Sequence, residues 1–173
     1  MPLRNPTELP GNLPSGQRLL GLDVGRKTIG LALSDVTLTI ASPLETIRRK
    51  RFGDDAERLG RLIGEYGVGA LVIGLPINMD GSEGRRCQSV RAFAANLMAR
   101  IDIDTCFWDE RLSTRAAERM LIDADVSRQR RGELVDKAAA AYILQGALDF
   151  IAKAASPPAP PPRPASGSNG GKR

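Results

Sequence analysis

The sequence contains no histidine among its 173 residues. This absence excludes the Ser-His-Asp triad, the Cys-His nucleophile pair, the His-Glu-x-x-His zinc motif and any histidine general base. Acid–base or metal chemistry must therefore rely on carboxylates, Lys, Tyr, Cys or a bound ion.

Cysteines, aromatic residues and long apolar runs are also scarce. Cys87 and Cys106 form neither a disulfide framework nor a Cys-x-x-Cys motif, which is typical of a reducing compartment. An aromatic content of 4% argues against the base-stacking platforms of RRM and OB domains. The N-terminus lacks the apolar region of a secretory signal, and no run approaches the roughly 18 apolar residues of a membrane span. We therefore expect no membrane association.

Prolines divide the chain into a folded centre and two arms. Ten of the twelve prolines lie in residues 1–17 and 156–173, and both segments lack hydrophobic periodicity. We predict that these segments are disordered arms and that residues 18–155 form one folded domain. Residues 156–173 carry three basic side chains and no acid, so +3 of the net charge of +5 lies in that arm. The net charge alone is therefore weak support for a nucleic-acid partner.

The folded centre alternates strand and helix patterns. Strands are predicted at 19–24, 29–34, 40–47, 70–75 and 103–109, and helices at about 54–66, 90–98, 113–122 and 133–153. The order βββαβαβαα, an antiparallel meander followed by strand–helix units, predicts an α/β fold with a five-stranded mixed sheet covered by helices.

Three acidic residues are unusual in this pattern. Asp23 ends an apolar strand, and alternation places it on the same face as two glycines, Gly21 and Gly25. Glu110 follows the fifth strand, and Asp136 begins the apolar stripe of the last helix. If the first, fourth and fifth strands are parallel, these carboxylates meet at the sheet edge where α/β proteins bind ligands.

Each acid also has a purely structural interpretation. Asp23 could open the turn at Gly25, one of the pair Asp109 and Glu110 could bond with Arg111, and Asp136 could stabilise the start of its helix. Alternation lets only one of Asp109 and Glu110 face the site.

Basic residues are clustered around the same predicted edge. The clusters are Arg26 and Lys27; Arg48, Arg49, Lys50 and Arg51; Arg85 and Arg86; and Arg128, Arg130 and Arg131. Such clusters provide the phosphate contacts that nucleic-acid binding requires, although a single cluster is usually a solvated surface. Three carboxylates without histidine favour Mg²⁺ or Mn²⁺ over Zn²⁺, and two such ions could support phosphodiester hydrolysis.

Four segments together resemble one known family. They are Gly21-Leu22-Asp23-Val24-Gly25 with 29–35, Gly74-Leu75-Pro76 with 79–82, Asp109-Glu110-Arg111-Leu112-Ser113-Thr114, and Val135-Asp136-Lys137 with 139–145. In this order they are similar to the bacterial YqgF (RuvX) family of pre-16S rRNA nucleases, relatives of the RuvC Holliday junction resolvases. The resemblance covers residues 18–152.

The resemblance implies a ribonuclease H-like fold, a cytoplasmic location and maturation of the 5′ end of 16S ribosomal RNA. It also implies that Asp23, Glu110 and Asp136 are metal-binding catalytic acids. RuvC-type enzymes place a further carboxylate after the fourth strand, whereas Gly74-Leu75-Pro76 contains none. The site would then fall short of a four-carboxylate centre.

The residues leave several functions open. The substrate could be structured precursor RNA or branched DNA, and a resolvase that cuts two symmetric strands would be a homodimer rather than a monomer. A non-catalytic nucleic-acid-binding module could share the fold. An ATPase of the actin or sugar-kinase type would need about twice this length.

Overall fold

The computed structural model describes residues 3–112 and 128–156, with side chains from residue 135 onward in the second range. The helix predicted at 113–122 and the arm predicted beyond residue 156 lie outside the described residues. The sheet has five strands in the order β3-β2-β1-β4-β5. Their bounds are β1 Arg18–Val24, β2 Thr28–Ser34, β3 Ala41–Arg48, β4 Val68–Leu75 and β5 Asp104–Asp109.

The sheet is mixed, as the sequence predicts. β2 pairs antiparallel with both β1 and β3, whereas β4 pairs parallel with β1 and β5. Pro43 lies in the edge strand β3, beside a register shift, where the absence of its N–H group is tolerated. β1, β3, β4 and β5 therefore run in one direction and end at the same edge of the sheet, here called the carboxyl edge.

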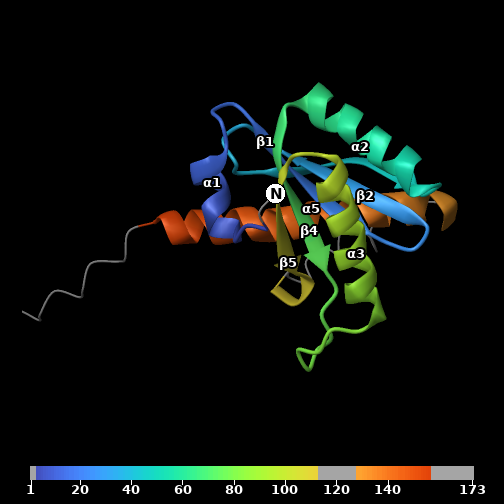
Figure 1. The fold of residues 1–173 in the computed structure, drawn as a ribbon. Coiled ribbons are helices and arrows are strands. Elements are labelled where there is room, and N and C mark those ends of the chain that lie inside the picture. Colours follow the sequence, from blue (N-terminus) through green and yellow to red (C-terminus); the bar gives the residue numbers. More distant parts are fainter. Residues whose placement is uncertain (1–2, 113–127, 157–173) are drawn as a thin grey trace, which may run out of the picture.

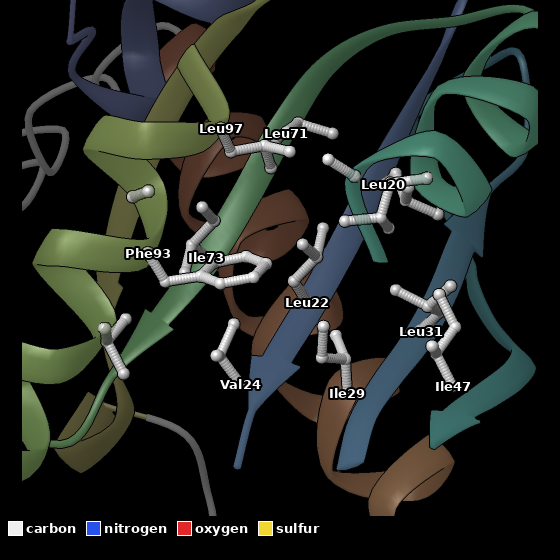
Figure 2. Close-up of a cluster of buried hydrophobic side chains, with 14 of the residues drawn as sticks. Leu20, Leu22, Val24, Ile29, Leu31, Ile47, Leu71, Ile73, Phe93 and Leu97 are labelled. Carbon is white, nitrogen blue, oxygen red and sulfur yellow. The ribbon is translucent and has the colours of Figure 1, made fainter. Parts of the chain in front are cut away.

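Two helices cover one face of the sheet. α2 (Phe52–Tyr66) and α3 (Arg85–Arg100) bury their apolar stripes against the even-numbered side chains of β1, including Leu20 and Leu22. Figure 2 shows this cluster, with Phe93 and Leu97 of α3 pointing toward the strands. α2 ends at Gly67, whose left-handed backbone (φ 62°) favours glycine.

The long helix α5 (Arg128–Ala155) covers the other face (Figure 1). Its buried side chains pack on Leu19, Ala32 and Val72; they are Ala140, Ile143, Leu144, Ala147, Leu148 and Ile151. A β-carbon at Gly30 of β2 would collide with the backbone carbonyl of Asp136. The absence of a side chain at residue 30 therefore lets α5 lie directly on the sheet.

The N-terminal segment packs on the same face as α5. Residues Pro6–Glu8 form a 3-10 turn (η1), Leu9–Asn12 form a short helix (α1), and Leu9 is 1% exposed within the α5 cluster. The Arg4 N–H group also donates a hydrogen bond to the Thr105 carbonyl at the edge of the sheet. The prediction of a disordered arm over 1–17 is therefore wrong from residue 3 onward, because Leu9, Leu13 and the Arg4 backbone anchor a segment that has no hydrophobic periodicity.

Both cysteines are buried free thiols, in keeping with the absence of a disulfide framework. Among the residues that the structure describes, no helix is long and apolar enough to cross a membrane.

Candidate active site

The predicted meeting of acidic residues at one edge depends on parallel first, fourth and fifth strands, and the structure has these directions. Asp23 is the second-last residue of β1, and Glu110 begins the 3-10 turn η2 (Glu110–Leu112) that directly follows β5. Because β1 and β5 both run parallel to β4, these two acids lie at the carboxyl edge. Strand direction and element order were thus sufficient to predict their proximity.

Asp23 faces α5. It shares a face of β1 with Gly21, where an added β-carbon would meet Leu144 and Ala140 of α5. Burial raises the pKa of the Asp23 carboxyl group, the negative charge of Asp136 raises it further, and the positive charge of Arg86 lowers it. The two aspartates therefore repel each other in a partly desolvated space.

Asp136 is held by a hydrogen bond to β2. The Thr28 hydroxyl donates to its Oδ2 atom over 2.8 Å. α5 begins at Arg128, more than two turns before Asp136, so this carboxylate does not stabilise the helix N-terminus. Sequence analysis missed Thr28, since nothing in the local pattern links two residues 108 positions apart.

Glu110, rather than Asp109, lies close to Asp23. Asp109 pairs with Arg111, with 2.7 Å between Oδ2 and Nη2. Burial, and then the charge of Asp23, raise the pKa of Glu110 to about 7 against an opposing effect from Arg86. Of the two acids, Asp109 is therefore the one that pairs with Arg111.

Glu110 also fills the space that a side chain at the end of β4 would need. An added β-carbon at Gly74 would lie 2.8 Å from Glu110 Oε1 and would touch Ile143. Gly74 lies in the segment where RuvC-type enzymes carry a further carboxylate. The neighbouring strand β5 therefore brings a carboxylate toward the position where β4 has none.

The chemistry of these three side chains suits a hard divalent cation. All the donors are carboxylate oxygens, and the raised pKa values of Asp23 and Glu110 reflect negative charges held close together in a desolvated place. A cation would relieve that repulsion. In the described parts of the chain, however, no three His, Cys, Asp or Glu side chains lie close enough to hold one ion together.

The predicted basic clusters have different surroundings. Arg26, Lys27, Arg85 and Arg86 are exposed at the carboxyl edge, after β1 and at the start of α3. The end of β3 carries the exposed residues Arg48, Lys50 and Arg51 to the same edge. The remaining predicted cluster, Arg128, Arg130 and Arg131, lies in the first turn of α5, where the structure describes the backbone but not the side chains.

Arg49 is turned toward the protein interior. Its guanidinium donates a hydrogen bond to the Gly25 carbonyl (2.8 Å) and lies 5.2 Å from the centre of the Phe93 ring. Its Nε atom is 3.9 Å from the buried carboxylate of Asp55. Arg49 therefore connects β3, α2 and α3 to the turn that follows Asp23.

Comparisons with known proteins agree with this fold. A model of the family described as "RuvX: Holliday junction resolvase" matches residues 17–150. A relative from Paramagnetospirillum magneticum is 62% identical over 149 residues, covering 86% of this chain and 96% of the relative. One from Rhodospirillum centenum is 56% identical over 156 residues, covering 87% and 83%. Both carry the name "Putative pre-16S rRNA nuclease".

Solved structures with the same fold are far more distant in sequence. Thermus thermophilus RuvC in complex with a Holliday junction substrate has a TM-score of 0.51 and 13% identity, covering 78% of this chain and 96% of RuvC. The yeast mitochondrial Holliday junction resolvase Ydc2 has a TM-score of 0.51 and 10% identity, covering 82% and 81%. These similarities support the ribonuclease H-like fold class.

Proposed function

Because the chain belongs to the RuvX family, and is therefore a nuclease and a hydrolase, we propose that it is a metal-dependent endonuclease of ribosome biogenesis. Its substrate would be structured RNA, the precursor of 16S ribosomal RNA, in which it hydrolyses phosphodiester bonds to mature the 5′ end. The names of relatives that are about 60% identical support this substrate. The enzyme would act in the cytoplasm.

One observation carries the proposal: Asp23 is in electrostatic contact with both other acids. The charge of Asp136 raises the pKa of Asp23, and the charge of Asp23 raises that of Glu110. Clustered carboxylates that repel one another are costly unless they bind a cation or serve catalysis. We therefore propose that Asp23, Glu110 and Asp136 are the catalytic acids.

Because the three acids, all among the described residues, do not lie close enough to hold one ion together, these side chains would share two Mg²⁺ or Mn²⁺ ions. A bound divalent cation would provide a nucleophile from water near neutral pH and would stabilise charge on the leaving oxygen, chemistry that histidine cannot supply in this chain. Thr28 would hold the Asp136 carboxylate in place, and the charge of Arg86 would favour the ionised forms of Asp23 and Glu110 against the effect of burial. The exposed basic residues beside them would hold the phosphate backbone.

The experiment is cleavage of a defined 16S precursor RNA, beside a four-way DNA junction, by the purified full chain with Mg²⁺. We expect Asp23→Asn to abolish RNA cleavage. The control is Asp102→Asn, an exposed carboxylate before β5 at the opposite edge of the sheet, which should cleave like the wild type. Undiminished cleavage by the Asp23→Asn variant would refute the catalytic assignment.

Branched DNA is the second candidate substrate, favoured by the fold shared with RuvC. A resolvase cuts two symmetric strands, so an active resolvase should sediment as a homodimer on the junction. Symmetric cuts in the junction with no cleavage of precursor RNA would favour this function. A monomer that cleaves only RNA would exclude it.

A non-catalytic nucleic-acid-binding module is the third candidate. It is favoured by the finding that no three potential ligands in the described parts of the chain are close enough to share one ion. Calorimetric titration distinguishes it from the enzyme. RNA binding without Mg²⁺ or Mn²⁺ binding would support the module, whereas metal binding that Asp23→Asn abolishes would support the nuclease.

A further inference from the structure

A small basic pocket opens at the carboxyl edge of the sheet. It has a volume of about 240 Å³ and lies between the end of β1 and the first turns of α3. Its apolar floor is formed by Val24 and Val90, and its polar wall by Arg26, Arg85, Arg86 and Ser89. This volume is below the roughly 300–1,000 Å³ of sites for drug-sized ligands, so it suits a single small group rather than a whole cofactor.

The positive charges of this pocket are only partly compensated, through the influence of Asp23 and Glu110 on Arg86. Arg26, Arg85 and Arg86 are exposed, and the described residues include no ion pair to any of them. Three guanidinium groups around one hollow repel one another unless an anion lies between them. Arginine forks match the geometry of phosphate oxygens particularly well.

The start of α3 adds to the same positive potential. The first hydrogen bond within this helix runs from the Gln88 N–H group to the Gly84 carbonyl, so the N–H groups of residues 85–87 have no partner within the helix. The first turn has no acidic residue and no side-chain cap. Arg85 and Arg86 therefore stand at the positive end of the helix dipole, where a cation is unfavourable and an anion is favoured.

The pocket and the acids share the carboxyl edge of the sheet. Val24, Gly25 and Arg26 of the pocket lining follow directly after Asp23 at the end of β1. The Asp23 side chain itself faces α5, on the opposite side of the strand from the pocket. An anion in the pocket would therefore lie at the same edge as the acids, across the end of β1 from the place where the scissile phosphate is expected.

We propose that the pocket binds a phosphate of the substrate strand adjacent to the one that is cleaved. This inference rests on the proposed nuclease function. Arg26 and Arg85 would hold that phosphate, and Arg86 would lie between it and the acids. Two neighbouring phosphates fixed at separate points would set the position and direction of the strand across the carboxyl edge.

The first experiment measures RNA binding by fluorescence anisotropy in EDTA, where cleavage does not interfere. Arg85→Gln should weaken the binding of a single-stranded RNA oligonucleotide roughly tenfold. It should also reduce the slope of log affinity against log salt by about 0.7, the value for one phosphate contact on a single strand. Arg100→Gln, at the other end of the same helix, removes the same charge and should change neither quantity.

The second experiment identifies the phosphate. The oligonucleotide carries one neutral methylphosphonate, on a 2′-deoxynucleotide, either 5′ or 3′ to the mapped cleavage position. At one of the two positions, we expect the methylphosphonate to weaken RNA binding by the wild type but to leave RNA binding by Arg85→Gln nearly unchanged. Such non-additive effects indicate direct contact between the arginine and that phosphate. Additive effects at both positions would overturn the proposal.

A titration with inorganic phosphate distinguishes a pocket that binds a free anion from one that binds a phosphate of the RNA strand. If phosphate shifts the amide NMR signals of residues 86–89 while both methylphosphonates stay additive with Arg85→Gln, the pocket binds a free anion and the proposal fails. If the wild type cleaves RNA but Arg85→Gln and Arg100→Gln bind alike, this inference fails and the nuclease function stands. If Asp23→Asn cleaves like the wild type, the catalytic assignment fails, whatever the binding data show.

Discussion

Thr28 donates a 2.8 Å hydrogen bond from its hydroxyl group to the carboxylate of Asp136, and so joins the start of β2 to the middle of α5. Gly30, on the same face of β2, allows the backbone of Asp136 to approach the strand. The position of one proposed catalytic acid thus depends on two residues of a neighbouring strand that bear no charge.

Replacement of Thr28 by valine should reduce activity while leaving the fold intact. Valine has nearly the same shape but cannot donate a hydrogen bond, so the Asp136 carboxylate would lose its orientation. We expect cleavage to fall roughly 10–100-fold, with a higher Mg²⁺ concentration needed for half-maximal rate. The measurement is a Mg²⁺ titration of the cleavage rate. Thr28→Ser keeps the hydroxyl and should stay within a few-fold of the wild type; equal losses in both variants would contradict this role.

The pKa of Glu110, raised from 4.5 to about 7, predicts how the stability of the metal-free protein depends on pH. Between these two values, the folded state holds a proton on Glu110 that the unfolded chain has released. The free energy of unfolding should therefore fall as the pH rises through this window, because ionisation of Glu110 is unfavourable in the folded state.

Urea denaturation in EDTA at pH 5 and pH 7.5 tests this prediction. Glu110→Gln removes the titrating group, so the variant should lose less stability than the wild type over the same interval. Acids that are distant from Glu110 contribute equally to both proteins and cancel in the comparison. Identical pH dependence in the two proteins would mean that Glu110 has an ordinary pKa.

Most of the sheet was predictable because its strands carry strong local patterns. β1 and β4 read as continuous apolar runs, and the parallel pairing of β4 with both β1 and β5 places Asp23 and Glu110 at one edge. Strand alternation alone could not choose between Glu110 and Asp109, and only the family resemblance favoured Glu110. The choice depends on the turn after β5 and on the pairing of Asp109 with Arg111.

Contacts that cross the fold left no signal in the sequence. Leu9 looked like part of a polar, proline-rich arm, yet it completes the core beneath α5. Arg49 stood among four consecutive basic residues and had the same local features as its neighbours. Only the arrangement of β3, α2 and α3 distinguishes it, because its guanidinium lies against Phe93 and the Gly25 carbonyl.

Removal of Arg49 should therefore affect stability more than RNA binding. Asp55 is 2% exposed, and its Oδ2 atom has no hydrogen-bond partner among the described residues, so Arg49 is the nearby charge that offsets its burial. Arg49→Ala should lower the free energy of unfolding by about 1–3 kcal/mol. The measurement is urea denaturation. Lys50→Ala, the matched exposed neighbour, should cost less than about 0.5 kcal/mol.

RNA affinity separates the two possible roles of Arg49. If its guanidinium serves mainly to hold the turn after Asp23, Arg49→Ala should leave the salt dependence of RNA binding unchanged. A salt slope reduced by about 0.7, with no loss of stability, would instead make Arg49 a phosphate contact.

Gly74 provides the sharpest test of how Glu110 is positioned. A methyl group at residue 74 would press on both Ile143 and Glu110, so Gly74→Ala should lower stability by about 1–3 kcal/mol and cleavage by more than tenfold. The double variant Gly74→Ala with Ile143→Val removes the clash on the Ile143 side. We expect it to recover much of the stability but not the activity, because Glu110 stays displaced.

Gly64→Ala, where an added methyl group meets nothing within 4 Å, controls for the loss of a glycine. Recovery of both properties in the double variant would show that Ile143, and not Glu110, accounts for the effect of residue 74.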